Sequence, residues 1–64
     1  MNQVLINIRK ERGLTIAKAA ECIGISYGML AMLETKKRRG SDKTKIIIAK
    51  FYNRTVEELF YNDN

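Results

Sequence analysis

Residues 15–34 read TIAKAAECIGISYGMLAMLE and contain two short helical patterns separated by a tight turn. Thr15 and Ser26 each precede an apolar helical segment and can cap it, because a hydroxyl oxygen accepts a hydrogen bond from an otherwise unpaired backbone N–H. Gly24 can end the first helix, and Ala20 is small enough for a second helix to approach closely. The segment therefore predicts two helices with a fixed crossing angle, over 16–23 and 27–34.

The flanking residues extend the helical pattern in both directions. On the N-terminal side, Leu5 and Ile8 belong to an apolar stripe that Gly13 ends. On the C-terminal side, Asn53 can end a helix in the left-handed conformation, and Thr55 begins a capping box. Further helices are therefore expected over 3–12, 43–52 and 56–60. The predicted fold class is all-α: a compact five-helix domain that spans residues 1–64.

The apolar residues that recur at helical spacing predict the core of this domain. A β-branched run, Ile46 to Ile48, would also suit a strand, but the pattern continues through Tyr52 and a lone strand would have no partner. The predicted core comprises Leu5, Ile8, Leu14, Ala20, Ile23, Ile25, Leu30, Leu33, Ile48, Tyr52, Val56 and Leu59.

Composition argues against several classes of protein. The chain has 64 residues, no His and a single cysteine, Cys22, so it can build neither an internal disulfide nor a zinc site. Catalysis is not expected, because there is no Ser–His or Cys–His pair and little room for a closed pocket. We expect no metal, no cofactor and no small-molecule ligand. No apolar run approaches the roughly 20 residues that cross a bilayer, and no signal peptide is visible, which predicts a cytoplasmic protein.

The net charge of +5 is concentrated in ten residues. The segment 36–45, KKRRGSDKTK, carries six cations and one anion, whereas the residues before it sum to +1 and those after it to −1. A basic block of this kind favours a polyanionic partner. The alternative is a solvated loop that keeps the protein soluble.

Two short helices joined by a tight turn are the arrangement of a helix-turn-helix, whose second helix enters the major groove of DNA. Over residues 5–60 the chain resembles the lambda Cro and repressor type of helix-turn-helix, the Xre family. Four segments carry the resemblance in order: LINIRKERGLT (5–15), AAECIGIS (19–26), LAMLE (30–34) and IAKFYNRTVEELF (48–60). The resemblance implies a small transcriptional regulator of the kind found in phages and mobile elements, which binds a palindromic operator in double-stranded DNA as a homodimer.

The resemblance also implies which residues face the bases. They are the first residues of the 27–34 helix and those one turn later: Tyr27, Gly28, Ala31 and Met32. Tyr27 can donate a hydrogen bond to a base or a phosphate, Met32 can contact a thymine methyl group, and Gly28 permits close approach of the backbone. For Met29 we prefer the alternative, a side chain that fills a gap in the core.

Phosphate contacts are implied at the loop after the recognition helix and at two helix N-termini. Such contacts position the protein without reading sequence. The expected residues are Thr15, Ser26, Lys36, Lys37, Arg38, Arg39, Lys43 and Lys45. The resemblance further implies an ion pair between Arg9 and Glu34, the alternative being two unrelated surface charges. The expected dimer contact comprises Phe51, Phe60 and Tyr61.

The chain departs from the family pattern at three positions. Ile16 stands where many members have a Gln that binds a phosphate, Lys36 replaces a Gly, and Gly40 replaces a Pro. The recognition surface YGMLAM is also poor in Gln, Asn and Arg. This apolar character favours a second hypothesis, a protein-interaction module that docks on another regulator through Tyr27, Met29 and Met32.

Overall fold

The computed structural model describes residues 1–61 and contains, within that range, five helices and no strand. The helices are α1 (Gln3–Glu11), α2 (Ile16–Ile23), α3 (Tyr27–Glu34), α4 (Asp42–Tyr52) and α5 (Val56–Phe60). The all-α fold with its helix-turn-helix is therefore confirmed. Helix α1 ends one residue earlier than predicted, and α4 begins one residue earlier because Ser41 caps it. The last three residues of the predicted 1–64 domain lie outside the described residues.

Short polar side chains begin the helices, as the sequence predicts for α2 to α5. The hydroxyl oxygens of Thr15, Ser26 and Ser41 accept hydrogen bonds from backbone N–H groups three residues later, at 3.1, 3.0 and 3.2 Å. Helix α5 has the predicted capping box, in which Thr55 and Glu58 each bond to the backbone of the other. These bonds satisfy donors that a helix start leaves unpaired.

Residues in the left-handed conformation end α1 to α4. They are Gly13, Gly24, Lys36 and Asn53, with φ of 70°, 93°, 61° and 57°. After each one, the next backbone N–H returns to a carbonyl five residues earlier, as in the bond of 2.9 Å from Lys37 to Met32. This is the Schellman motif, which prefers glycine at the left-handed position. Glycine occupies two of these positions, whereas Lys36 ends α3 with a full side chain.

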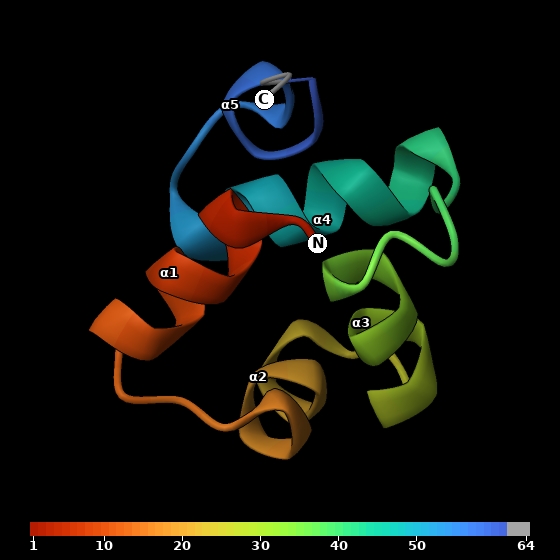
Figure 1. Ribbon diagram of the computed structural model, residues 1–64. Helices are drawn as coiled ribbons and strands as arrows, with labels where there is room; N and C mark the ends of the chain where they lie inside the picture. Colours follow the sequence, from red (N-terminus) through yellow and green to blue (C-terminus); the bar gives the residue numbers. More distant parts are fainter. Residues whose placement is uncertain (62–64) are drawn as a thin grey trace.

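The two helices of the central segment form one half of the molecule. Helices α2 and α3 lie together below α4 in Figure 1, and α5 lies on the other side of α4. The chain turns by 114° between α2 and α3, within the range of a helix-turn-helix. No single helix within residues 1–61 is long and apolar enough to cross a membrane; α2 and α3 pass that test only when taken together as a bent pair.

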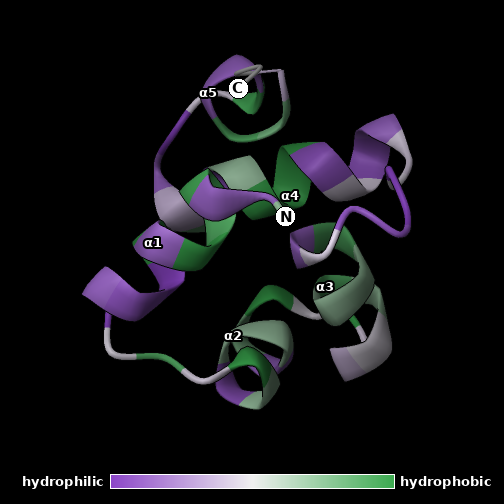
Figure 2. Ribbon diagram, in the orientation of Figure 1, coloured by the Kyte–Doolittle hydropathy of each residue, from purple (hydrophilic) through white to green (hydrophobic). Residues whose placement is uncertain are grey.

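Two apolar clusters hold these helices in place. The larger contains Leu5, Ile8, Leu33, Ile48, Ala49, Tyr52 and Leu59, and the smaller joins α2 to α3 through Ala19, Ala20 and Leu30. Figure 2 shows that hydrophilic residues gather in the loop between α3 and α4 and at the end of α1. The cations of this loop are therefore exposed next to the end of α3, the helix that the smaller cluster holds against α2.

The predicted core needs correction at its edges. Leu14, Ile23, Ile25 and Val56 are only half-buried, and they pack against the rims of the two clusters. Ile6, Ala19 and Ala49 are buried but were not predicted. The physical reason is size: a domain this small has too little chain to cover both sides of every apolar residue.

Candidate nucleic-acid interface

One face of α3 is open to solvent and carries all four predicted base-reading residues. Tyr27 is 58% exposed and Met32 is 41% exposed, Gly28 is exposed, and Ala31 is half-buried. Spacings of three and four residues place these positions together on a helix. Met29 instead packs against the larger core cluster, so the preferred interpretation of that residue is confirmed.

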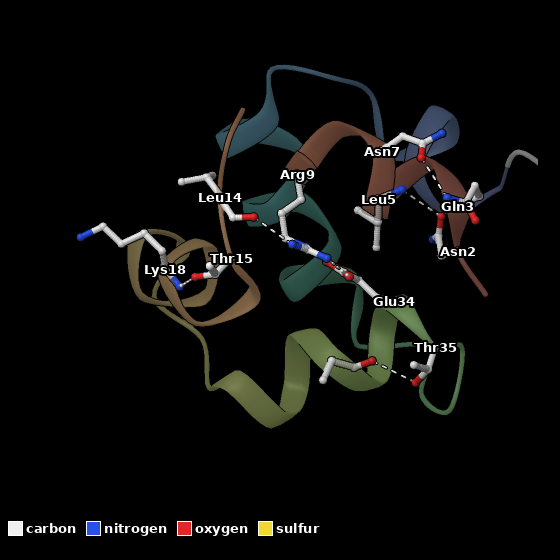
Figure 3. Close-up of polar contacts among 11 residues, drawn as sticks. Asn2, Gln3, Leu5, Asn7, Arg9, Leu14, Thr15, Lys18, Glu34 and Thr35 are labelled. Carbon is white, nitrogen blue, oxygen red and sulfur yellow. Dashed lines mark hydrogen bonds and ion pairs between the residues drawn. The ribbon is translucent and has the colours of Figure 1, made fainter. Parts of the chain in front are cut away.

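The opposite side of α3 is fixed to α1 by a buried ion pair. Arg9 donates to both carboxylate oxygens of Glu34, from Nε at 2.8 Å and from Nη2 at 3.1 Å (Figure 3). Arg9 is 9% exposed and Glu34 is 2% exposed. The hydrogen bonds to Glu34 raise the pKa of the Arg9 guanidinium, against the opposing effect of burial. The predicted pair is therefore confirmed, and the alternative of two unrelated surface charges is wrong.

Sequence reasoning missed Asn2, which ties the C-terminal end of α3 to two other elements. Its backbone N–H donates to the Glu34 carbonyl at 2.7 Å, and its side-chain amide donates to the Leu59 carbonyl at 2.8 Å. Its side-chain oxygen also caps α1, accepting from Leu5 at 3.1 Å. An asparagine just before the first apolar stripe was a visible capping signal. The two bonds to distant carbonyls have no such signal.

The basic loop is attached to the last turn of α3. The backbone N–H groups of Lys37 and Arg38 donate to the Met32 carbonyl, and the Thr35 hydroxyl donates to the Ala31 carbonyl at 2.9 Å. The side chains of Lys36, Lys37, Arg38 and Arg39 are exposed. None of the four forms an ion pair within residues 1–61. Four exposed cations without an ion-pair partner in that range therefore follow directly after α3.

Comparison with known proteins agrees with this geometry. A helix-turn-helix family model matches residues 5–59, a range that includes parts of all five helices. The chain belongs to the Cro/C1-type, Xre-like helix-turn-helix family. No match was found among curated proteins or solved structures. Members of this family are DNA-binding regulators and typically non-enzymatic, so DNA binding and transcription regulation follow for this chain as well.

Ile16 shows how this helix-turn-helix does without the glutamine that many members have there. Its side chain is half-buried and packs against the small cluster between α2 and α3, which contains Ala19, Ala20 and Leu30. Ile16 therefore adds apolar packing to the cluster that joins α2 to α3. The two helix N-termini remain accessible, because Thr15 and Ser26 are exposed. Their hydroxyl groups are already engaged in capping, so a phosphate would meet the backbone N–H groups there.

The structure corrects the prediction that Lys45 contacts a DNA phosphate. It is only 8% exposed, and its ammonium donates to the Tyr61 hydroxyl at 2.9 Å. The same ammonium lies 4.7 Å from the centre of the Tyr61 ring and 5.8 Å from that of Phe60. Lys45 therefore points toward α5 rather than outward, whereas Lys43 is exposed near the start of α4.

The three aromatic residues of the expected dimer contact lie in two places. Phe60 and Tyr61 lie beside Lys45, which belongs to the N-terminal half of α4. Phe51 lies six residues further along α4, or about 9 Å, with its ring against Tyr52 and its carbonyl near Arg12. Phe51 and Phe60 are half-buried against the core, while Tyr61 is 58% exposed. Tyr61 is thus the residue of this group with most surface to offer.

Proposed function

We propose that this protein is a sequence-specific transcriptional regulator, a small Cro-like repressor of a phage or mobile element. It acts in the cytoplasm of a bacterial cell or a phage-infected host. One observation carries this proposal: the helix with the exposed face, α3, is followed directly by a loop of exposed, unpaired cations, and backbone hydrogen bonds hold this loop to the last turn of α3. A helix that enters the major groove needs phosphate-binding groups beside it.

The two parts of this surface have different tasks. Lys36, Lys37, Arg38 and Arg39, with Lys43 and the N-termini of α2 and α3, hold the phosphates on either side of the groove. Tyr27 and Met32 face the base edges, where a phenol donates a hydrogen bond and a thioether contacts a thymine methyl group. Gly28 has open space where a side chain would begin, so the backbone can approach the bases.

A palindromic operator requires two copies of the chain. One domain reads one half-site, and two recognition helices about 34 Å apart meet successive major grooves on one side of the DNA. We assign the contact between copies to Phe60 and Tyr61, because Tyr61 is the most exposed of the aromatic residues near the C-terminal end. Phe51 is left out, since it lies near Arg12 instead.

Selection of bound sequences from a random pool of duplex DNA tests this function. The wild-type protein should enrich a sequence with two-fold symmetry. Tyr27→Leu and Met32→Ala should each alter the preferred base at one position, since a good base contact is worth about 1–3 kcal/mol. Lys50→Met, an exposed residue of α4 outside this surface, serves as the control and should select the wild-type sequence.

The same experiment distinguishes this function from the second hypothesis, a protein-interaction module. A docking module that uses Tyr27 and Met32 against another protein would enrich no sequence, and both substitutions would leave DNA affinity unchanged. The exposure of these two apolar-rich side chains is the observation that favours docking. The four loop cations favour DNA, because an apolar docking surface gains little from them.

A further inference from the structure

A groove of about 520 Å³ lies on the other side of the basic loop, between the loop, α4 and the end of α5. Its walls carry four cations and two aromatic rings: Lys36, Arg38, Arg39, Lys45, Phe60 and Tyr61. None of the described residues that line it is a carboxylate. The volume falls in the range of small-molecule sites, roughly 300–1,000 Å³. The groove is therefore large enough for a ligand and strongly favours an anion.

Lys45 gives this groove a charged centre. Lysine is rarely this buried unless it is paired, yet no carboxylate lies within ion-pair distance of its ammonium among residues 1–61. An ammonium has three hydrogens to donate, and within the same residues the Tyr61 hydroxyl is its hydrogen-bond acceptor. The aromatic rings compensate part of the charge. A bound oxyanion would supply the missing acceptors and counter-charge together.

The aromatic rings narrow the class of ligand. Cations and N–H donors are enough to hold inorganic phosphate, and the two adjacent rings add an apolar surface that phosphate alone does not use. Planar bases stack on such rings, and this stacking does not require a particular base. We propose that the groove binds a free mononucleotide, with its phosphate at Lys45, Arg38 and Arg39 and its base against Tyr61 and Phe60.

The site would regulate DNA binding, an effect that rests on the proposed function above. Lys36, Arg38 and Arg39 line the groove and also belong to the phosphate-contacting loop. A nucleotide that engages their side chains takes them from DNA. Tyr61 is likewise shared with the proposed dimer contact. Occupation of the groove would thus weaken operator binding, so that the nucleotide acts as an effector.

Titrations observed by NMR test the site directly on the full chain, without DNA. The probes are adenosine 5′-monophosphate, ribose 5-phosphate, which lacks the base, and adenosine, which lacks the phosphate. Adenosine 5′-monophosphate should bind at least about fivefold more tightly than either fragment, the lower end of what base stacking provides. Its binding should change the chemical shifts of Lys45, Phe60 and Tyr61. Equal affinity of adenosine 5′-monophosphate and ribose 5-phosphate would overturn the proposal, because it would indicate general attraction to a basic protein.

Matched variants locate the binding. Tyr61→Leu should reduce affinity for the nucleotide to that of ribose 5-phosphate, while Ile46→Ala, at an exposed apolar residue that does not line the groove, should leave this affinity unchanged. Lys45→Met should weaken binding of both phosphorylated probes about tenfold, and Lys50→Met should not. Equal effects of Lys45→Met and Lys50→Met would contradict a site in this groove. A circular dichroism spectrum establishes that each variant is folded, and Tyr61→Leu, at a position that is 58% exposed, keeps the proposal testable if Lys45→Met does not fold.

A final titration separates this proposal from the proposed function. Adenosine 5′-monophosphate is added to the complex of the protein with duplex DNA, and release of DNA is expected at the concentration that fills the groove. Because the titrations without DNA do not involve the operator, their outcome decides the groove even if the protein binds no DNA. Absence of DNA binding would count against the proposed function alone.

Discussion

Lys36 occupies a left-handed position that glycine would fill without strain. Its φ is 61°, and for a residue with a side chain this conformation costs roughly 1–2 kcal/mol. Lys36→Gly should remove that cost, offset in part by the greater chain entropy of glycine when unfolded. We expect an increase of about 0.5–1 kcal/mol in the free energy of unfolding, measured by urea denaturation. Lys37→Gly, at the next residue with ordinary φ, should give no increase, and an equal gain there would contradict the interpretation.

The Arg9–Glu34 pair should behave as a buried pair whose partners need one another. Arg9→Met leaves the Glu34 carboxylate buried without its partner and also removes a hydrogen bond of 2.8 Å to the Leu14 carbonyl. Loss of one partner should cost about 3–5 kcal/mol. The double variant Arg9→Met, Glu34→Leu should recover much of that loss, because it leaves no unpaired charge. Urea denaturation of Arg9→Met, Glu34→Leu and the double variant measures this, and additive losses in the double variant would be evidence against coupling.

Tyr52 should make the protein sensitive to alkaline pH. Burial raises the pKa of its phenol, and the nearby negative charge of Glu34 raises this pKa further. Below about pH 10 the phenol is neutral in the folded and unfolded states, so it adds no pH dependence. Above that pH the unfolded chain loses the proton first, and stability falls until the pH passes the raised folded pKa.

Tyr52→Phe should remove this alkaline loss of stability. Within residues 1–61 the Tyr52 hydroxyl is buried without a hydrogen-bond partner, so its deletion should also cost little at neutral pH. Melting temperatures between pH 8 and about pH 11 compare wild type and variant, with Tyr27→Phe as the exposed control. A Tyr52→Phe curve that falls in parallel with wild type would show that other groups cause the loss.

At the scale of the elements, the local rules of helix starts and ends explain why the sequence predicts so much. Thr15, Gly24, Ser26 and Asn53 act through residues within five positions of themselves, and all four take the predicted role. Chain separation explains what the sequence does not predict. Asn2 bonds to a carbonyl 57 residues away, and that partner depends on how α5 lies on α1.

The direction of a side chain is the second feature that the sequence does not predict. Lys45 and Lys43 are both lysines of a basic block, yet one turns toward α5 and is buried. The sequence shows two lysines of equal charge in the same block. They differ only in the folded protein, where Phe60 and Tyr61 lie beside Lys45. The candidate surface on α3 was predictable because a helix fixes which residues share a face. The groove beside the loop was not, because it joins residues from four segments.

The loop after α3 should contribute to DNA affinity without discriminating sequences. Replacing both Arg38 and Arg39 with Ala removes two phosphate contacts and leaves α3 unchanged. Affinity should fall for every duplex alike, and the slope of log K against log salt should decrease by about 2. Fluorescence anisotropy at several salt concentrations measures the slope. Arg54→Ala, an exposed cation on the linker to α5, should leave it unchanged, and an unchanged slope for the double variant would remove both arginines from the interface.

At the scale of the whole molecule, small size makes pairing important. The radius of gyration is 10.3 Å, so a single domain cannot reach two major-groove segments about 34 Å apart. Two chains that bind adjacent half-sites gain affinity from one another only if they touch. The proposed contact through Tyr61 would supply that gain and would impose a fixed distance between half-sites.

The geometry of the operator therefore tests the dimer. Sedimentation of the protein with its selected duplex should show two chains per palindrome, bound cooperatively. Insertion of about five base pairs between the half-sites moves them to opposite sides of the DNA, since one helical turn is about 10–10.5 base pairs. This insertion should abolish cooperativity while each half-site still binds one chain. An insertion of about ten base pairs should place both half-sites on the same side again but too far apart for contact.

Tyr61→Ala should reproduce the loss of cooperativity on the unaltered operator. Saturation of the palindrome by a single chain, or cooperativity that ignores the spacing, would exclude a dimer formed through this contact.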